Sequence, residues 1–435
     1  MLRPDESELL TRVGPGTPMG DLMRQYWIPA FMSSELAEPD GAPMRVRLLG
    51  ENLIAFRVTS GKVALVAQTC PHRGASLFYG RNQENGIRCV YHAWKFDVDG
   101  RCVDMPAESP ENSFKDKVRL NAYRCIERNG IVWTYMGPRE EPPPLPDIEP
   151  NMLPEGEGMV WTAMRGCNWL QALEGDIDTS HLAILHLGSV TPDDLVPGTF
   201  GYYAARAWTP RYEVIDTDFG TSYGAYRPAE EDSYYWRLAH YLMPFFTMIP
   251  TGLLGRQALV RAWVPIDDEH TMFWSMEAPH SSAAERMPSR NGQPFAGTTA
   301  QPKFLPNTTD WLGRWRLEAN ESNDYFIDRE VQRTQSFTGI DGIHLQDQLI
   351  TESMGPIIDH SNEHLGISDS MIIRTRRRMI RAAIDLREGI VPATVDSPEL
   401  YRTRSGGVIL PRSSDWLEAT KELRQAFVDH PELVP

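Results

Sequence analysis

The chain has 435 residues, which is enough for two domains that each bury a core. It carries 43 Lys and Arg against 59 Asp and Glu, a formal net charge of −16 at pH 7. This acidic balance argues against nucleic acid or an anionic membrane as the main partner. Five cysteines, a polar start and no long apolar run lead us to expect a cytoplasmic protein in a reducing compartment.

The first third of the chain predicts a small all-β module. Apolar segments alternate with Gly or polar turns at residues 44–49, 53–58, 63–66 and 130–135. The following stretch, residues 141–158, is too rich in Pro and Gly for a regular element and is interpreted as a linker. We therefore expect a domain at residues 25–140, preceded by a segment 1–24 that packs with the C-terminal domain.

Two pairs of metal ligands lie within this module. Cys70 and His72 form the first pair, and Cys89 and His92 form the second after a gap of sixteen residues. Such a set also suits structural zinc, but zinc spacings usually group the cysteines and then the histidines. Here each cysteine is paired with a histidine, as in a Rieske [2Fe–2S] cluster, in which two imidazoles raise the reduction potential. The pattern therefore predicts an electron-accepting cluster.

The C-terminal half, residues 159–435, mixes predicted strands and helices, so the expected fold class is α+β. Strands are expected at residues 236–243 and 258–263, and a helical pattern runs over residues 346–386. Residues 283–306 are rich in Ser, Asn, Gly, Pro and Thr, which predicts a long exposed loop.

A second constellation lies early in this half. Asp178, His181 and His186 occur where apolar residues have helix-like spacing. A separation of five residues is about 140° on an ideal helix, so one metal could bind both histidines only across a widened or broken turn. Asp178 lies three residues before His181 and could accept a hydrogen bond from a nearby imidazole. The competing interpretation, polar residues on a helix surface, is weakened by the metal motif upstream.

Together these motifs resemble the oxygenase component of Rieske non-heme iron aromatic-ring oxygenases. Residues 168–175, 346–347 and 363–366 are similar to the phthalate dioxygenase-like branch of that family. The resemblance implies an all-β Rieske domain followed by a helix-grip catalytic domain, an antiparallel sheet with helices. It also implies a single kind of subunit, assembled as a homotrimer or as stacked trimers. Many members carry glycine after the second cluster histidine, where this chain has Ala93.

The same resemblance implies a second metal centre. His181, His186 and Asp347 would hold a mononuclear Fe(II) as a 2-His-1-carboxylate triad, leaving one face open for O₂ and substrate. Within the sequence alone, nearby carboxylates remain rivals for the third position: Glu352, Asp341 and Asp359.

The resemblance also implies how electrons would travel. Asp178 would link the iron ligand His181 of one subunit to the cluster ligand His92 of its neighbour. A separate NAD(P)H-dependent reductase, with flavin and iron–sulfur groups, would supply the electrons one at a time. No nucleic acid or membrane partner is expected.

The substrate residues are less clearly indicated. Arg206 and Arg237, both expected on strands, could clamp a substrate carboxylate as phthalate-type oxygenases do, assisted by Ser180. Ordinary surface arginines paired with Asp or Glu are an equally open interpretation. Core packing is the better explanation for a group of apolar residues nearby: Met243, Phe245, Phe246 and Met248.

An arginine-rich stretch, residues 374–378 with Arg381, invites a nucleic-acid interpretation. On so acidic a chain, a solvated or intersubunit ion-pair face is the better explanation, and docking of an acidic reductase domain is a weaker one.

Three functions therefore stay open from the sequence. The first is an oxygenase of aromatic catabolism that hydroxylates a carboxylated aromatic ring, by monooxygenation or dioxygenation. The second is an O-demethylase or diaryl-ether-cleaving monooxygenase acting on a lignin-type or phenoxybenzoate-type acid. The third is a Rieske electron-transfer protein without catalytic iron, which would bind about two irons per chain instead of about three.

Overall fold

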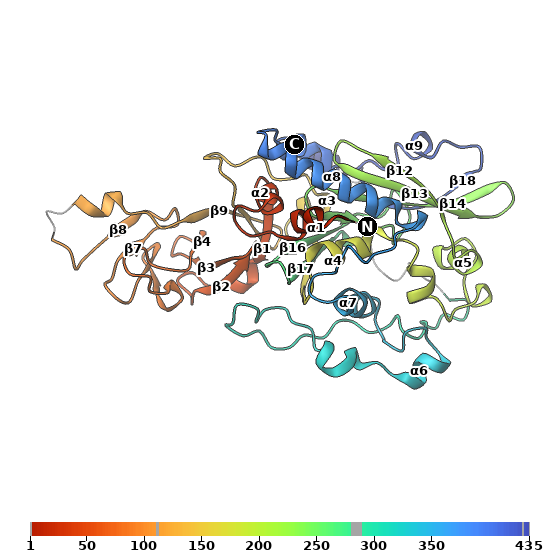
Figure 1. Ribbon diagram of the computed structural model, residues 1–435, viewed down its shortest axis with the longest axis horizontal. Helices are drawn as coiled ribbons and strands as arrows, with labels where there is room; N and C mark the ends of the chain where they lie inside the picture. The colour runs from red at the N-terminus through yellow and green to blue at the C-terminus, as the bar shows by residue number, and fades with distance from the viewer. Residues whose placement is uncertain (1, 110–112, 280–288, 429, 435) are drawn as a thin grey trace.

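The computed structural model describes residues 2–109, 113–279, 289–428 and 430–434. The molecule has a narrow end built from N-terminal strands and a broad end built from a larger sheet and its helices (Figure 1). Two antiparallel sheets form the narrow end. The first has the order β1 (Trp27–Met32), β10 (Ile131–Tyr135), β9 (Ala122–Arg128), β4 (Val63–Ala67), β3 (Glu51–Arg57) and β2 (Met44–Leu48). The second has the order β5 (Arg81–Gln83), β6 (Gly86–Arg88), β7 (Lys95–Phe96) and β8 (Cys102–Asp104).

Strand β3 shows why both of its faces are apolar. Leu53 and Ala55 point into the main core, which the narrow end shares with the large sheet. Ile54 and Phe56 point the other way, into a smaller core that also contains the two cluster-loop cysteines. Because strand side chains alternate, one apolar run fills both cores and places the cysteine loops over a packed base.

The broad end is an eight-stranded antiparallel sheet. Its order is β11 (Met159–Arg165), β17 (Thr271–Glu277), β16 (Leu259–Pro265), β15 (Phe246–Met248), β14 (Ser233–Leu242), β13 (Gly220–Pro228) and β12 (Arg211–Asp216), and β18 (Gly406–Pro411) pairs with β14. The four apolar residues for which core packing was expected, Met243, Phe245, Phe246 and Met248, all belong to the main core. This confirms core packing as their role.

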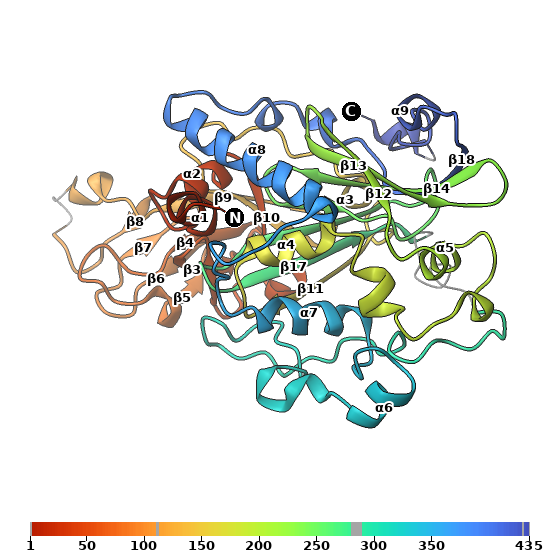
Figure 2. The same cartoon turned by 45° about the vertical axis from the view of Figure 1, so that its right-hand side comes forward.

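Helices surround this sheet. They are α1 (Pro4–Thr11), α2 (Pro18–Met23), α3 (Glu149–Met152), α4 (Trp169–Ile177), α5 (Phe200–Arg206), α6 (Arg329–Thr334), α7 (Ile343–Ser353), α8 (Ser370–Arg387) and α9 (Trp416–Ala419). Helices α4 and α8 lie across the large sheet (Figure 2), and α1 and α2 pack against α8. Within the described ranges we find no helix with both the length and the apolar character needed to cross a bilayer.

The expected α+β class and all four N-terminal strands are confirmed, and one expectation needs correction. The helical pattern over residues 346–386 is not one helix, because α7 ends at Ser353 and α8 begins at Ser370. Gly355, Pro356 and Gly366 lie in the gap. The expected loop at residues 283–306 lies partly outside the described residues, and residues 289–306 contain no helix or strand.

Candidate metal centres and pocket

The two cysteine loops of the narrow end have the same backbone shape. The amide of Gly74 donates to the Cys70 carbonyl (2.9 Å), and the amide of Ala93 donates to the Cys89 carbonyl (3.0 Å). Each cysteine amide in turn donates to the carbonyl five residues later, at 2.8 and 2.9 Å. Such paired turns bring two thiols and two imidazoles to one place.

The side chains on these loops fit a Rieske cluster. Cys70 and Cys89 are 2% and 3% exposed, whereas the two imidazoles lie nearer the surface with their ring centroids 4.5 Å apart. His72 is stacked on Trp94 at 4.3 Å. Nδ1 of His92 is buried and has no hydrogen-bond partner, as expected of an atom kept for a metal. The donor set therefore provides buried thiolates on one side and imidazoles on the other.

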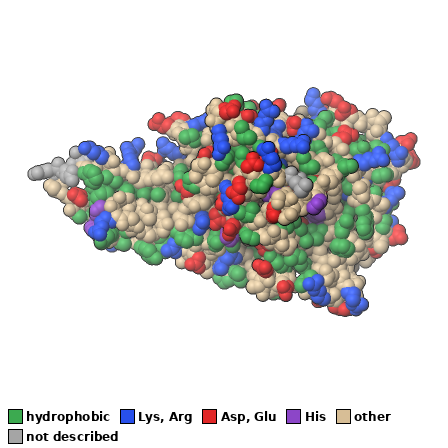
Figure 3. All heavy atoms as spheres, viewed as in Figure 1, with side chains coloured by type: hydrophobic (Ala, Val, Ile, Leu, Met, Phe, Trp, Pro, Cys, Tyr) green, Lys and Arg blue, Asp and Glu red, His purple; other side chains and the backbone are tan. Residues whose placement is uncertain are grey.

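Apolar side chains surround the exposed side of this site. Tyr79, Val90 and Tyr91 are 64%, 59% and 55% exposed. Figure 3 shows histidine and basic side chains at the surface of the same narrow end. An apolar patch with a polar rim is typical of a protein–protein contact.

The second constellation is carried by a helix that breaks where the sequence analysis expected it to. Helix α4 ends at Ile177, and Asp178 has extended backbone angles. The chain then forms a π-helical turn, Leu182–His186, with His181 immediately before it. The widened turn predicted from the five-residue spacing is thus confirmed. It allows His181 and His186 to face each other with ring centroids 5.3 Å apart.

Helix α7 brings Asp347 to these histidines. Oδ1 of Asp347 lies 3.6 Å from Nε2 of His181 and 3.2 Å from Nε2 of His186. One ligand atom from each residue lies within 4.8 Å of the others, so the three could hold one metal ion. Nε2 of His186 is buried and has no hydrogen-bond partner. Its lone pair is therefore the one that a metal would use.

The rival carboxylates have other partners. Glu352 accepts from the Gly166 amide and the Tyr325 hydroxyl. Asp341 accepts from Thr299, and Asp359 accepts from Ser361. Of the four candidates, Asp347 is the one that the structure places beside the histidines.

Both histidines are oriented through their second ring nitrogen. Nδ1 of His181 lies 3.2 Å from Oδ2 of Asp178, and Nδ1 of His186 lies 2.6 Å from Oε1 of Gln346. The amide nitrogen of Gln346 donates to the carbonyls of Gly297 and Ile340, which fixes the direction of its oxygen. Each imidazole therefore carries its proton on Nδ1 and leaves Nε2 free. This role of Gln346 was not predicted from the sequence, although the residue stands directly before Asp347.

The carboxyls and the imidazole of this site shift each other's pKa in opposite directions. Burial opposes ionisation of Asp178 and Asp347, but the adjacent histidines outweigh it and lower the pKa of both carboxyls. Burial alone would lower the pKa of His181, yet the hydrogen bond to Asp178 and the charge of Asp347 raise it. The carboxylates are thus stabilised by positive charge beside them, and a bound cation would supply that charge in place of a proton on the imidazoles.

A pocket adjoins the three ligands. Its apolar walls include Leu182, Leu187, Phe200, Ile249, Pro250 and Ile343. Two arginines also line it, and they differ in their partners. Arg261 donates to Asp176 at 2.6 Å. Arg237 is 2% exposed, donates one hydrogen bond to the Pro250 carbonyl (2.9 Å) and leaves Nε and Nη1 without a partner.

The other two predicted substrate residues lie elsewhere. Arg206 is on helix α5, not on a strand as expected, because the segment 200–206 is helical. Its side chain is 43% exposed, lies 3.8 Å from Glu230 and is absent from the pocket lining. Ser180 shares a 2.6 Å hydrogen bond with the Tyr212 hydroxyl. Of the three, Arg237 is the one brought to the pocket.

A second group of possible metal ligands already binds an arginine. Glu174, His360 and Glu363 lie close enough for a metal. However, Arg376 donates to both oxygens of Glu174 (2.5 and 2.6 Å) and to both oxygens of Glu363 (2.6 and 2.9 Å). This arrangement is a buried Glu–Arg–Glu triad that joins α4 to α8.

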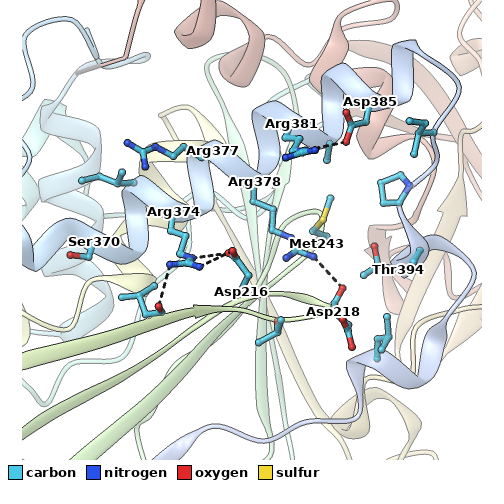
Figure 4. Close-up of a pocket in the computed structure, with 18 residues that line it drawn as sticks. Asp216, Asp218, Met243, Ser370, Arg374, Arg377, Arg378, Arg381, Asp385 and Thr394 are labelled. Atoms are coloured by element: carbon cyan, nitrogen blue, oxygen red, sulfur yellow. Dashed lines mark hydrogen bonds and ion pairs between the residues drawn. The ribbon is translucent and has the colours of Figure 1, made fainter. Parts of the chain in front are cut away.

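Four other arginines of α8 line a cavity of about 1150 Å³ (Figure 4): Arg374, Arg377, Arg378 and Arg381. Arg374 makes two 2.8 Å hydrogen bonds to Asp216, Arg378 donates to the Asp218 carbonyl and Arg381 faces Asp385 at 3.6 Å. The predicted ion-pair face is thus confirmed for Arg374 and Arg381. Arg376 is the exception because it is buried.

Comparison with known proteins agrees with this geometry. Residues 26–123 match the family described as Rieske [2Fe-2S] domain, and residues 134–431 match the one described as LigXa C-terminal domain like. The 3-chlorobenzoate-3,4-dioxygenase oxygenase subunit of Comamonas testosteroni is 48% identical, covering 97% of this chain and 99% of that protein. The phthalate 4,5-dioxygenase oxygenase subunit of Pseudomonas putida is 38% identical, covering 89% and 88%.

Among solved structures, dicamba monooxygenase bound to dicamba shares the fold with a TM-score of 0.55 at 16% identity, covering 85% of this chain and 99% of that one. The chain belongs to the Rieske non-heme iron oxygenases, oxidoreductases whose cofactors are a Rieske [2Fe–2S] cluster and a mononuclear iron. Within that family it is an oxygenase (alpha) component of the phthalate dioxygenase-like branch, as its motifs predicted.

Proposed function

We propose that the protein is the terminal oxygenase that hydroxylates an aromatic carboxylic acid, using O₂ and electrons from a separate NAD(P)H-dependent reductase. The observation that carries this proposal is Arg237, a buried cation in the pocket with no ion-pair partner among the described residues. A buried charge is costly unless it is paired. A substrate carboxylate would pair it through charge-assisted hydrogen bonds. The relatives named for chlorobenzoate and phthalate support the same substrate class.

Each metal centre has its own ligands in this proposal. The cluster is held by Cys70, His72, Cys89 and His92, and the iron by His181, His186 and Asp347. When bound, the cluster supplies single electrons and the iron activates O₂. The protein positions these ligands: Asp178 and Gln346 hold the imidazoles in the tautomer that leaves Nε2 free.

The pocket orients the substrate between charge and metal. Arg237 would hold the carboxylate, and the apolar walls formed by Leu182, Phe200 and Ile343 would enclose the ring and keep water away from it. The three residues that would hold the iron, His181, His186 and Asp347, line the same pocket. Binding therefore places a ring carbon near the metal in one preferred orientation.

The active unit is proposed to be an assembly of identical subunits, a homotrimer or stacked trimers, in the cytoplasm. The exposed apolar patch of Tyr79, Val90 and Tyr91 would contact the neighbouring subunit. The neighbour's Asp178 would then lie between the cluster of one chain and the iron of the next. All five cysteines are free thiols in the structure, as expected in a reducing compartment.

The decisive experiment combines metal analysis with oxygen uptake on the purified holoenzyme. We expect about three irons per chain, from the ligand count of the two sites. With a surrogate reductase, aromatic acids should be hydroxylated and their uncharged esters should not. Formaldehyde release from a methoxylated acid would instead identify an O-demethylase. About two irons per chain would contradict the oxygenase function.

A matched pair of variants tests the role of the carboxylate. Arg237→Met removes the buried guanidinium, whereas Arg206→Met removes an exposed one on α5. We expect Arg237→Met to raise KM for the acid by about 10- to 100-fold, since a hydrogen bond to a charged group contributes about 1.5–3 kcal/mol. Arg206→Met should behave as the parent protein. Equal effects of the two substitutions would contradict the proposed contact.

A further inference from the structure

A second buried arginine stands next to Arg237. Strand β13 pairs with β14 so that Arg227 is opposite Tyr235 and Ala225 is opposite Arg237. Arg227 and Arg237 are therefore diagonal neighbours, and both side chains leave the sheet on the same face.

Neither arginine has a counter-ion. Arg227 is fully buried, donates from Nε to the Ala207 carbonyl (2.8 Å) and leaves Nη1 and Nη2 without a partner. Arg237 leaves Nε and Nη1 without a partner. In the part of the chain that the structure describes, no aspartate or glutamate forms an ion pair with either guanidinium.

Both groups are nevertheless charged at neutral pH. Burial, together with the neighbouring charge of Arg237, lowers the pKa of Arg227 to about 10, against the opposing effect of nearby tyrosines. Burial also lowers the pKa of Arg237. Arg261, the other arginine of the pocket, is neutralised by Asp176. Arg227 and Arg237 are thus two neighbouring buried cations without a counter-ion among the described residues.

Helix α5 and the residue after it cover this pair. The Phe200 ring lies 3.7 Å from the Arg237 guanidinium carbon, and the Ala207 carbonyl accepts from Arg227. Water is therefore excluded on this side, and two like charges repel more strongly in a medium of lower dielectric constant. The fold holds together two cations that would separate in water.

We propose that Arg227 and Arg237 form one dicationic subsite that selects the ionised carboxylate of an aromatic acid over its neutral ester or amide. The inference rests on the proposed function and deepens it. Arg237 is the contact residue because it lines the pocket. Arg227 is a positioning residue that acts through its charge from behind Arg237, so that an anion relieves the repulsion between the two cations.

The test compares two probes that share one ring and differ in charge, benzoate and methyl benzoate, on the holoenzyme by calorimetric titration and thermal shift. Arg227→Met should weaken benzoate binding by about tenfold, or 1.4 kcal/mol, and leave methyl benzoate unchanged. Arg227→Lys keeps the charge and should keep most of the affinity for benzoate. Arg206→Met, which removes an exposed arginine, is the matched control.

Three results would overturn the proposal. Arg227→Met could leave benzoate binding unchanged, it could weaken both probes equally, or Arg227→Lys could lose as much affinity as Arg227→Met. The last two results would show that Arg227 acts by packing alone.

Stability without ligand gives an independent measurement. Because Arg227→Met replaces a buried cation that has no counter-ion by a neutral side chain, the variant should unfold at the same temperature as the parent protein or a higher one. A large fall in the unfolding temperature, or failure to fold, would show that Arg227 is satisfied within the fold and would contradict the proposal.

The proposed function and this inference fail in different ways. If Arg237→Met leaves benzoate binding intact, the carboxylate contact itself is wrong, whatever Arg227 does. If Arg237→Met abolishes benzoate binding while Arg227→Met has no effect, the function stands and the dicationic subsite is wrong.

Discussion

At the scale of single residues, Ala93 shows how closely the two cluster loops match. Gly74 and Ala93 each stand four residues after a cysteine and have positive φ angles, +75° and +61°. A β-carbon makes this left-handed conformation cost about 1–2 kcal/mol, a cost that glycine avoids. The glycine common in the family at this place thus has a backbone reason, and this chain is strained there.

Replacing Ala93 by glycine should therefore stabilise the protein. We expect Ala93→Gly to increase the free energy of unfolding of the narrow end by about 1 kcal/mol, because glycine removes the strain. The measurement is denaturant unfolding of the holoenzyme followed by the visible absorbance of the cluster. Ala75→Gly is the control, since Ala75 does not have a positive φ, and it should stabilise nothing. Equal effects at both positions would refute the strain argument.

Gln346 offers a residue-scale test of the iron site. Gln346→Leu removes the acceptor for Nδ1 of His186, so the imidazole loses its fixed tautomer. Loss of such a supporting partner typically costs 10- to 100-fold in metal affinity, roughly 1.4–3 kcal/mol. The measurement is retention of the mononuclear iron during competition with a chelator. Gln348→Leu, on the same helix but directed toward Ala319 and Glu352, should retain iron as the parent protein does.

Some residues of these sites could be predicted from the sequence directly, others only from family resemblance, and others not at all. Cysteine and histidine have few roles at such spacings, so the cluster motif and the histidine pair could be predicted directly. Asp347 could be selected only by family resemblance, because three rival carboxylates lie near it in the chain. The roles of Gln346 and Arg227 could not be predicted, since each depends on partners brought together by the fold and not by spacing.

At the scale of elements, the proposed metal ligands lie where a helix departs from regular geometry. The π-helical turn Leu182–His186 was predictable because a five-residue spacing cannot place two ligands on one side of an ideal helix. The break between α7 and α8 was missed because the helical periodicity resumes after the gap. The proposed division of the chain at residues 24, 140 and 158 stays a prediction.

The buried triad that joins α4 to α8 should be essential for stability. Arg376→Met would leave Glu174 and Glu363 buried without their cation, and breaking a buried ion pair costs about 3–5 kcal/mol. Arg374→Met is the matched control on the same helix, because its pair with Asp216 is exposed and contributes at most about 1 kcal/mol. Denaturant unfolding of both variants measures the difference. Similar losses would mean that the triad is no stronger than a surface ion pair.

At the scale of the whole molecule, the two metal centres lie in different parts of the chain. The loops of the four-stranded sheet are at the narrow end, whereas α4 and α7 are in the broad end, in both views (Figures 1 and 2). The exposed apolar side chains Tyr79, Val90 and Tyr91 are also typical of a protein–protein contact. Both observations favour electron transfer between subunits.

Mixed assemblies can test this route. A Cys89→Ser subunit lacks a cluster and an Asp347→Ala subunit lacks iron, so each should be inactive when assembled alone. Co-expression should restore part of the activity, since an intact cluster in one chain can then serve an intact iron site in the next. Product formation by purified mixed assemblies is the measurement. Mixed assemblies that form but stay inactive would place the route within one chain.

The unequal burial of the cluster ligands has a practical consequence. Cys70 and Cys89 are buried inside the chain, whereas the two imidazoles lie nearer the surface, and in the proposed assembly the neighbouring subunit would shield them from dissolved oxidants. Mass action then links cluster lifetime to subunit concentration. In air, the visible absorbance of the cluster should bleach faster in the diluted enzyme than in the concentrated enzyme. Val90→Asp places a charge in the exposed apolar patch, so this variant should bleach quickly even when it is concentrated. The shelf life of the cofactor would thus report the strength of the subunit contact.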